Sequence, residues 1–299
     1  MKKPKRIDRN RREKWLNMLY ILPMLAVYVV FILYPMTSVM KLSLFDKKIN
    51  GDMIFVGLQN FADFFTNIDT PRVFLNTAVW VFVGVFLKLG LGLIMALALY
   101  KKFYGKKLIT GIMLIPYAMP AAVACMIWRL LYNPMFGHIG QFLRDLGITA
   151  QAVGFLGNTN TSLIAVMIVN VWAVAPFCAL NILSTLYSIP RYIYEAASID
   201  GANAWQRFRC ITMPLISSSM RTLGILIGIW AFNSFDVIYM MTQGGPANSS
   251  AILVNLIYDN AFRFNNRGYS AAISVVSFVL LSVFAILYVR AKEDEVSYE

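Results

Sequence analysis

Long uninterrupted runs of apolar residues dominate the chain, and short charged segments separate them. A helix needs about 20 residues, at 1.5 Å per residue, to cross the hydrocarbon of a bilayer. Such segments must be helical, because lipid offers no hydrogen-bond partner to a bare backbone. The pattern predicts an all-α polytopic membrane protein with six transmembrane helices, at Trp15–Met40, Val73–Tyr100, Leu108–Tyr132, Ser162–Tyr187, Pro214–Phe235 and Ala271–Arg290.

Basic residues determine the predicted orientation of these helices. Lys and Arg are concentrated at 1–14, 101–107 and 191–209, all on the side that would also hold both termini. Segments of this kind stay in the cytoplasm. We predict a basic cytoplasmic N-terminal segment at 1–14, a membrane domain at 15–290 and a cytoplasmic tail at 291–299. The first run is too long for a signal peptide and lacks its cleavage site, so we expect the first helix to be retained.

Composition narrows the classes of function. The 299 residues are 59% hydrophobic, and the formal net charge is +12. A basic soluble protein would suggest a nucleic-acid partner, but here the charge flanks apolar runs, so we expect a lipid bilayer and no nucleic acid. Cys125, Cys178 and Cys210 form no CxxC pair, and His138 is the single histidine. Neither a disulfide framework nor a metal site is therefore expected.

The predicted cytoplasmic loop at 188–213, between the fourth and fifth helices, has a distinctive pattern. It contains Glu195-Ala196-Ala197, then Gly201, and after nine more residues Ile211-Thr212-Met213-Pro214. Helix-forming residues follow Pro190, which suits the start of a short helix, and Gly201 permits the backbone angle that ends one. Ala196 and Ala197 present a small surface to an approaching protein, while Glu195 and Asp200 add charges. A solvated amphipathic loop is the plainer alternative.

This loop resembles the EAA motif of binding-protein-dependent ABC importer permeases. The family pattern is EAA, three residues, Gly, nine residues and Ile-x-Leu-Pro, and this chain departs from it only by Met213 for Leu. The resemblance implies that a cytoplasmic ATPase docks on this loop, and the residues that it assigns to ATPase coupling are Glu195, Ala196, Ala197, Asp200, Gly201 and Pro214. A GxxxxGK[ST] phosphate loop is absent from the sequence. We therefore expect a transport subunit that is not an enzyme and holds no cofactor, with ATP and Mg bound by the partner ATPase.

Other stretches resemble carbohydrate importers of the maltose and glycerol-phosphate type. They include Phe55-Val56-Gly57-Leu58-Gln59-Asn60-Phe61 and Thr242-Gln243-Gly244-Gly245-Pro246. The resemblance implies translocation of a carbohydrate across a bacterial-type inner membrane. It also implies four partners: a second homologous permease subunit, two ATPase subunits and an external sugar-binding protein.

A carbohydrate path needs aromatic faces for sugar rings and polar groups for their hydroxyls. Asn170, Phe177 and Asn181 share one face of the fourth helix, and Trp172 points elsewhere. Carried over by position from the EAA loop, the resemblance implies sugar contacts at Asn170, Trp172, Phe177 and Trp230, with Asn233 nearby. The full set of candidates for the substrate path is Asn170, Trp172, Phe177, Asn181, Trp230, Asn233 and Asp236. Ordinary helix packing is the alternative for each intramembrane side chain.

Two rival functions remain on sequence grounds, namely an ion-coupled secondary transporter and a channel subunit. A proton-coupled transporter would normally place acids within its helices, whereas Asp236 lies at a helix edge. Lys88 lies well inside the second helix, where we expect it to snorkel or to have a structural partner.

Overall fold

The computed structural model describes residues 20–47, 53–148 and 154–296. It divides into two compact units. Unit 1 holds the described residues up to Thr66 together with Ile257–Phe278, and unit 2 holds Asn67–Leu256 and the residues from Val279 onward. The basic segment at 1–14 lies outside the described residues, and so does the end of the predicted tail.

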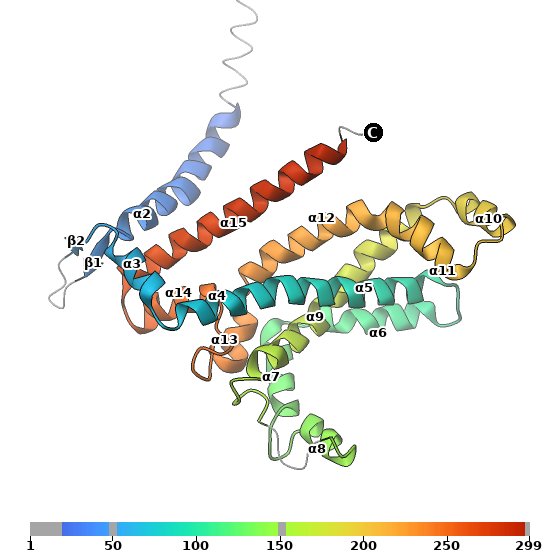
Figure 1. Ribbon diagram of the computed structural model, residues 1–299, viewed down its shortest axis with the longest axis horizontal. Helices are drawn as coiled ribbons and strands as arrows, with labels where there is room; N and C mark the ends of the chain where they lie inside the picture. The colour runs from blue at the N-terminus through green and yellow to red at the C-terminus, as the bar shows by residue number, and fades with distance from the viewer. Residues whose placement is uncertain (1–19, 48–52, 149–153, 297–299) are drawn as a thin grey trace, which may run out of the picture. The chain divides into compact units, whose positions relative to one another are not determined.

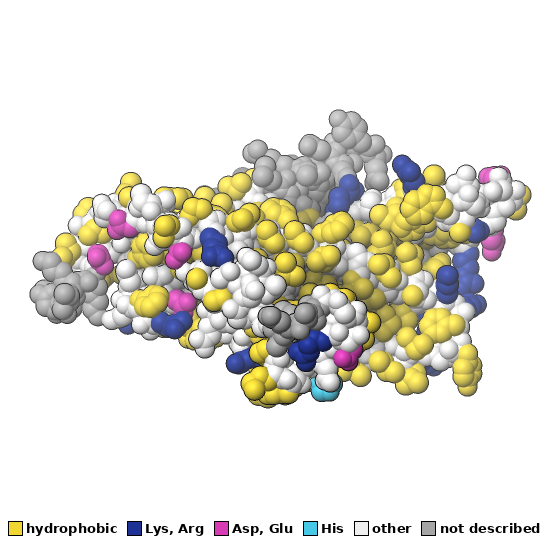
Figure 2. All heavy atoms as spheres, turned by 60° about the horizontal axis from the view of Figure 1, so that its bottom comes forward, with side chains coloured by type: hydrophobic (Ala, Val, Ile, Leu, Met, Phe, Trp, Pro, Cys, Tyr) yellow, Lys and Arg dark blue, Asp and Glu magenta, His cyan; other side chains and the backbone are white. Residues whose placement is uncertain are grey.

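Helices long and apolar enough to cross a membrane account for most of the described chain (Figure 1). Together with one bent pair of helices they confirm the predicted number of spans. The continuous helices are Tyr20–Leu42, Thr70–Tyr100, Ser162–Ser188, Ala204–Phe232 and Arg267–Ile286, the last of which continues to Val296. Yellow hydrophobic side chains cover much of the surface in Figure 2, as expected for a protein that faces lipid.

The third predicted span is broken, whereas we predicted one helix over Leu108–Tyr132. Helix α6 (Lys106–Ala118) and helix α7 (Ala121–Leu131) meet at an angle of 95°. Met119, at the break, has an extended backbone with φ −78° and ψ 135°. The ring of Pro120 explains this conformation, because it disfavours helical angles in the residue before it.

Unit 1 contains the only strands of the described chain. Strand β1 (Phe45–Lys47) pairs antiparallel with β2 (Met53–Phe55). The side chain of Asn60, in helix α3 (Gln59–Thr66), fixes the entry to this hairpin by donating to the carbonyl oxygens of Ser43 and Phe45, at 2.9 and 3.0 Å. The other elements of unit 1 are η1 (Val29–Leu33), α2 (Tyr34–Leu42), η4 (Asp259–Arg263) and the first part of α15 (Arg267–Val296).

The frame of unit 2 is a pair of long helices packed at close range. Helix α4 (Thr70–Ala78), the π-turn η2 (Val79–Val83) and α5 (Gly84–Tyr100) run as one helix, and α5 packs along α9 (Ser162–Ser188). A Cβ atom at Gly92 would lie 2.6 Å from Cβ of Cys178, so only glycine fits. Lys88 is 3% exposed, and its ammonium lies 5.9 Å from the ring centre of Trp80. The burial of Lys88 and its contact with Trp80 favour a structural role for this lysine over snorkelling to the membrane surface.

Short helices and loops complete unit 2. Their bounds are α8 (His138–Asp145), α10 (Arg191–Ile199), α11 (Ala204–Arg207), η3 (Phe208–Thr212), α12 (Met213–Phe232), α13 (Asp236–Thr242) and α14 (Leu253–Tyr258), of which the last begins in unit 2. The loop after α13 is tied to α4, because Nδ2 of Asn76 donates to the carbonyl oxygens of Asn248 and Ala251 at 3.0 and 3.1 Å. Trp80 Nε1 likewise donates to the carbonyl oxygen of Ala231 at 3.1 Å.

Candidate coupling segment and substrate path

The EAA pattern forms helix α10, whose two ends are built as the sequence predicts. Pro190 occupies its N-cap, with φ −62°. At the other end Gly201 has φ +79°, a left-handed conformation that L side chains rarely adopt. The amides of Gly201 and Ala202 donate to the carbonyl oxygens of Ser198 and Ala197, at 3.2 and 2.9 Å. This pair of bonds is a Schellman motif, which ends the helix sharply.

Hydrogen bonds tie α10 to the helix that follows it. Asn203 and Gln206 form a capping box, with bonds of 2.9 and 2.8 Å, which starts the next helix after a short turn. Across the turn, a guanidinium nitrogen of Arg207 donates to the hydroxyl of Ser198. The hydroxyls of Tyr194 and Thr212 also lie 3.0 Å apart. The segment is therefore braced on both sides of Gly201.

The surface of α10 is open, as the predicted docking of a partner protein would require. Glu195, Ala196, Asp200 and Gly201 are exposed, and Ala197 is half-buried. Sequence reasoning missed three large apolar side chains that are also exposed on this segment: Tyr192, Ile199 and Trp205. Large apolar residues inside a charged loop between two spanning helices are a signal that could have identified them.

Helix five begins earlier than predicted. We expected it to start at Pro214, yet α11, η3 and α12 form one helix from Ala204 to Phe232. Pro214 thus lies inside this helix, two residues after the end of the π-turn η3. In the π-turn the amide of Met213 reaches the carbonyl oxygen of Phe208. The wider turn accommodates a proline, which lacks an amide donor and crowds the preceding turn of a regular helix.

Three aromatic rings from three helices form a stack in unit 2. Phe177 of α9 stacks on Tyr117 of α6, with ring centres 5.2 Å apart, and contacts Trp230 of α12 at 5.5 Å. Trp230 is 48% exposed, so one side of the stack stays accessible. Two of the predicted path residues, Phe177 and Trp230, are thereby brought together from different helices.

A polar cavity of about 350 Å³ lies between α9 and α12, and Asn181 lines it. Asn181 is one helical turn beyond Phe177, and its Nδ2 donates to the carbonyl oxygen of Phe177 at 2.8 Å. Hydroxyl groups supply most of the polar lining, namely those of Ser184, Thr185, Ser218, Ser219 and Thr222. The polar cavity and the contact between Phe177 and Trp230 therefore both lie between α9 and α12.

Four other predicted path residues lie elsewhere. Asn170 is buried, and its Oδ1 has no hydrogen-bond partner among the residues that the structure describes. Trp172 packs against Trp128 of α7, with ring centres 5.5 Å apart. Asn233 and Asp236 are exposed beyond the end of α12, and Asn233 donates to the carbonyl oxygen of Ile229 in its own helix at 3.0 Å. The structure does not bring these four to the α9–α12 cavity.

Sequence reasoning missed the ring of Tyr117 and all the hydroxyl groups of the cavity. The run Ser217-Ser218-Ser219 in a spanning helix was an available signal, because polar side chains inside a membrane need a partner or a water-filled space. Nothing comparable marked Tyr117, since tyrosines are common at both ends of spanning helices.

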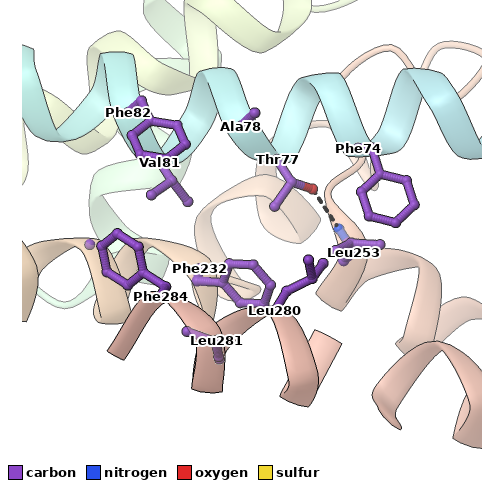
Figure 3. A pocket seen from close by; sticks show the side chains of 11 residues that line it. Phe74, Thr77, Ala78, Val81, Phe82, Phe232, Leu253, Leu280, Leu281 and Phe284 are labelled. Carbon is purple, nitrogen blue, oxygen red and sulfur yellow. Dashed lines mark hydrogen bonds between the residues drawn. The ribbon is translucent and has the colours of Figure 1, made fainter. Parts of the chain in front are cut away.

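A second cavity of unit 2 has the opposite chemistry. It measures about 210 Å³, and phenylalanine and leucine side chains of α4, α12 and α15 line it (Figure 3). Thr77 supplies the hydroxyl in its wall, and that oxygen accepts from the amide of Leu253 at 3.1 Å. With its hydroxyl so engaged, this cavity suits an apolar group and offers little to a sugar.

Spanning helices, a braced short helix between two of them and a polar cavity between two spans are the features expected of a solute-translocating membrane subunit. Residues 88–293 match the family described as the binding-protein-dependent transport system inner membrane component, and the chain belongs to that family. It is a permease subunit of an ABC importer. This membership confirms the EAA resemblance and does not support the rival transporter and channel functions.

Individual relatives agree with this assignment. The chain is 35% identical to the trehalose/maltose transport system permease protein MalF of Thermococcus litoralis, over 93% of this chain and 94% of that one. It is 30% identical to the sn-glycerol-3-phosphate transport system permease protein UgpA of Agrobacterium fabrum, over 95% and 97%. The fold matches a crystal structure of a bacterial ABC transporter that imports the acidic polysaccharide alginate, with a TM-score of 0.83, 19% identity, and coverage of 97% and 99%.

Proposed function

We propose that this permease moves a carbohydrate along the seam between α9 and α12. The observation that carries the proposal is the polar cavity between these helices, which lies next to the Phe177–Trp230 pair. Aromatic faces bind the apolar faces of sugar rings, and clustered hydroxyl and amide groups exchange hydrogen bonds with sugar hydroxyls. Relatives named for trehalose/maltose and glycerol-phosphate transport support the substrate class.

The energy for transport enters, in this proposal, through α10. A separate ATPase binds ATP and Mg and docks on the face formed by Glu195, Ala196, Ala197, Asp200 and Gly201. The bonds across Gly201 make α10 rigid with respect to the start of the next helix. A push on α10 therefore reaches both α9 and α12, which are the walls of the cavity, whereas a slack tether would absorb it.

The complete importer in this proposal contains a second homologous permease, two ATPase subunits and an external sugar-binding protein. The family description, a binding-protein-dependent transport component, supports the external partner. The basic segments 101–107 and 191–209 support cytoplasmic ends for α5 and α9, and so cytoplasmic termini in an inner membrane. Pro214 takes part as a residue of the helix just beyond the π-turn, rather than as a docking contact.

The path is tested by uptake into proteoliposomes that hold the complete importer. We expect Trp230→Ala to lose most uptake of labelled carbohydrates or to change the preferred sugar. Trp172→Ala, which alters a tryptophan packed against α7, is the matched control and should keep its preference. Equal effects of the two variants would place the path elsewhere. Uptake without the ATPase would contradict the proposed energy source.

Orientation needs a separate measurement. Single cysteines near Lys5 and near Glu299 should be shielded from an impermeant thiol reagent in intact cells, and one near Asp63 should react. The reason is the excess of basic residues on the proposed inner side. Labelling of either terminus from outside would contradict this topology.

A further inference from the structure

A second polar cavity lies at the cytoplasmic end of unit 2, apart from the proposed path. It measures about 490 Å³ and is bordered by the ends of α5 and α9 and by the starts of α6 and α10. Its lining holds three cationic side chains, Lys102, Lys106 and Arg191, and three tyrosines, Tyr100, Tyr187 and Tyr194. Figure 2 shows dark blue side chains gathered at the end of unit 2 that carries α10.

The described side chains that line this basic pocket carry a net positive charge. Glu195 also lines it but forms no ion pair there with any of the three cations. Lys106 is held in place, because its ammonium donates to the hydroxyl of Tyr187 and lies 5.2 Å from that ring centre. Tyr100 and Tyr187 are themselves in contact, with ring centres 5.5 Å apart. One cation is thus pre-positioned on an aromatic support.

The depth of the pocket is that of the lipid headgroups. Tyr100 is the last residue of the spanning helix α5, and Tyr187 is the last but one of α9. Tyrosines at the ends of spanning helices lie at the membrane–water interface, where the ring faces hydrocarbon and the hydroxyl faces water. The cations of the pocket follow directly outside this boundary, at 102, 106 and 191.

We propose that the basic pocket binds the phosphate group of an anionic phospholipid of the inner leaflet. Three cations and the tyrosine hydroxyls supply the charge-assisted donors that a phosphate diester accepts, and basic pockets between spanning helices hold such headgroups. The choice of leaflet rests on the orientation proposed above. A free phosphate has the same chemistry, so the source must be settled by experiment.

Occupancy of the pocket bears on coupling. Arg191 and Glu195 belong to the first turns of α10, and the opposite wall belongs to α5 and α6. A bound phosphate would hold the start of α10 against these helices through Arg191. Anionic lipid should therefore raise the ATPase activity that the loaded binding protein stimulates.

The test compares two pairs of lysines in the same short segment. Lys102→Gln/Lys106→Gln removes two cations of the pocket, whereas Lys101→Gln/Lys107→Gln removes two neighbouring exposed cations that do not line it. The purified importer is placed in nanodiscs of phosphatidylcholine with rising fractions of phosphatidylglycerol, and retained phosphatidylglycerol is counted by native mass spectrometry. A direct hydrogen bond to a charged group is worth about tenfold or more in binding, so the pocket pair should bind phosphatidylglycerol roughly 100-fold more weakly and the control pair should lose far less.

The source of the phosphate is resolved by a second arm. Protection of Lys102 from an amine reagent is measured in nanodiscs of phosphatidylcholine alone, with inorganic phosphate added, and in nanodiscs that contain phosphatidylglycerol. Protection by phosphatidylglycerol alone supports the lipid. Protection by inorganic phosphate at low concentration in phosphatidylcholine supports a phosphate site but overturns the lipid as its source.

Three outcomes would overturn the proposal entirely. They are equal loss of phosphatidylglycerol in both lysine pairs, no loss in either pair, and protection of Lys102 by the ATPase in the absence of any added anion. The last would assign the pocket to the ATPase interface. Because lipid retention is measured without transport, it can fail while the proposed carbohydrate path stands, and the reverse also holds.

Discussion

The two sides of α9 are built on opposite principles. Toward α5 the helix is closed, since the contact at Gly92 leaves no room for a single methyl group. Toward α12 it borders a cavity of about 350 Å³ lined by hydroxyl groups. Close packing of small residues holds helices together in lipid, where the hydrophobic effect gives no net attraction between them. The α5–α9 pair is thus the fixed frame, and the α9–α12 seam is the side able to change.

The order of the helices along the chain links the α9–α12 seam to the proposed docking element. Helix α9 ends at Ser188, α10 follows, and the helix that contains α12 begins at Ala204. The proposed docking element therefore joins the two walls of the polar seam and is not part of the frame. Figure 1 shows α10 and α11 together at one end of unit 2, near the loop that links α5 to α6.

The sharpest way to break the frame is to add one methyl group to it. In Gly92→Ala the new Cβ would lie 2.6 Å from Cβ of Cys178, and backbone atoms of Ala175 and Ala179 leave it no escape. We expect a loss of roughly 1–3 kcal/mol or more in stability, seen as a lower unfolding temperature in detergent. Gly90→Ala is the control, because its Cβ would meet nothing within 4 Å. Equal unfolding temperatures would contradict a closed frame.

The junction between the docking element and the seam is tested at Gly201. Left-handed backbone costs an L residue about 1–2 kcal/mol, and more when it is β-branched. Gly201→Val should therefore insert normally but weaken co-purification of the ATPase by roughly tenfold. Gly201→Asn tolerates this conformation and should retain most of the association. If Asn fails as badly as Val, the surface at 201, and not its backbone angle, is what the ATPase needs.

A milder change addresses the polar side of α9. Ser218→Ala and Ser219→Ala each remove a hydroxyl from the cavity, and a neutral hydrogen bond is worth about 0.5–1.5 kcal/mol. Transport KM should rise by roughly two- to tenfold per substitution. Ser217→Ala is the matched control, because the hydroxyl of Ser217 donates to the carbonyl oxygen of Pro214 at 2.7 Å and does not line the cavity. An unchanged KM in both cavity variants would separate the seam from the path.

The smallest effect is expected from loss of the hydrogen bond that Arg207 donates to Ser198 across the turn at Gly201. Arg207→Gln removes the bond from the guanidinium to Ser198, and an exposed bond of this kind contributes about 1 kcal/mol or less. Stimulated ATPase activity should fall by roughly threefold while binding-protein affinity stays the same. Arg209→Gln, on the same segment, removes equal charge without such a bond among the described residues and should change neither. If stimulated ATPase activity fell only in Arg209→Gln, the positive charge at 209 would matter and the Arg207–Ser198 hydrogen bond would not.

Much of this architecture was predictable because lipid imposes one strong rule on the sequence. Helix α9 was predicted from its first residue, since a spanning segment must be both apolar and helical. The break of the third span at Pro120 was not predicted. The same span also contains Pro116, which lies inside α6 without ending the helix. A single sequence does not reveal which of two nearby prolines the surrounding helices accommodate.

The candidate site shows a similar division. The left-handed angle at Gly201 followed from local chemistry, which depends on a few neighbouring residues. The pairing of Phe177 with Tyr117 and Trp230 depends on how three helices rotate about their axes, and no local rule sets that rotation. Asn170 and Phe177 share a helical face in sequence terms, yet only Phe177 joins the stack, because the two residues lie two helical turns, about 10 Å, apart along the axis.

The backbone at Gly201 also has a consequence in terms of handedness. A Cβ atom there would meet nothing within 4 Å among the described residues, so the position is spacious, and it disfavours most L residues through chirality rather than crowding. A D-amino acid favours the same positive φ that Gly201 adopts, at +79°. D-alanine introduced by semisynthesis should therefore stabilise the end of α10 more than glycine does, because it restricts the unfolded chain. D-alanine would adopt the backbone conformation of Gly201 without strain, whereas L-alanine would not.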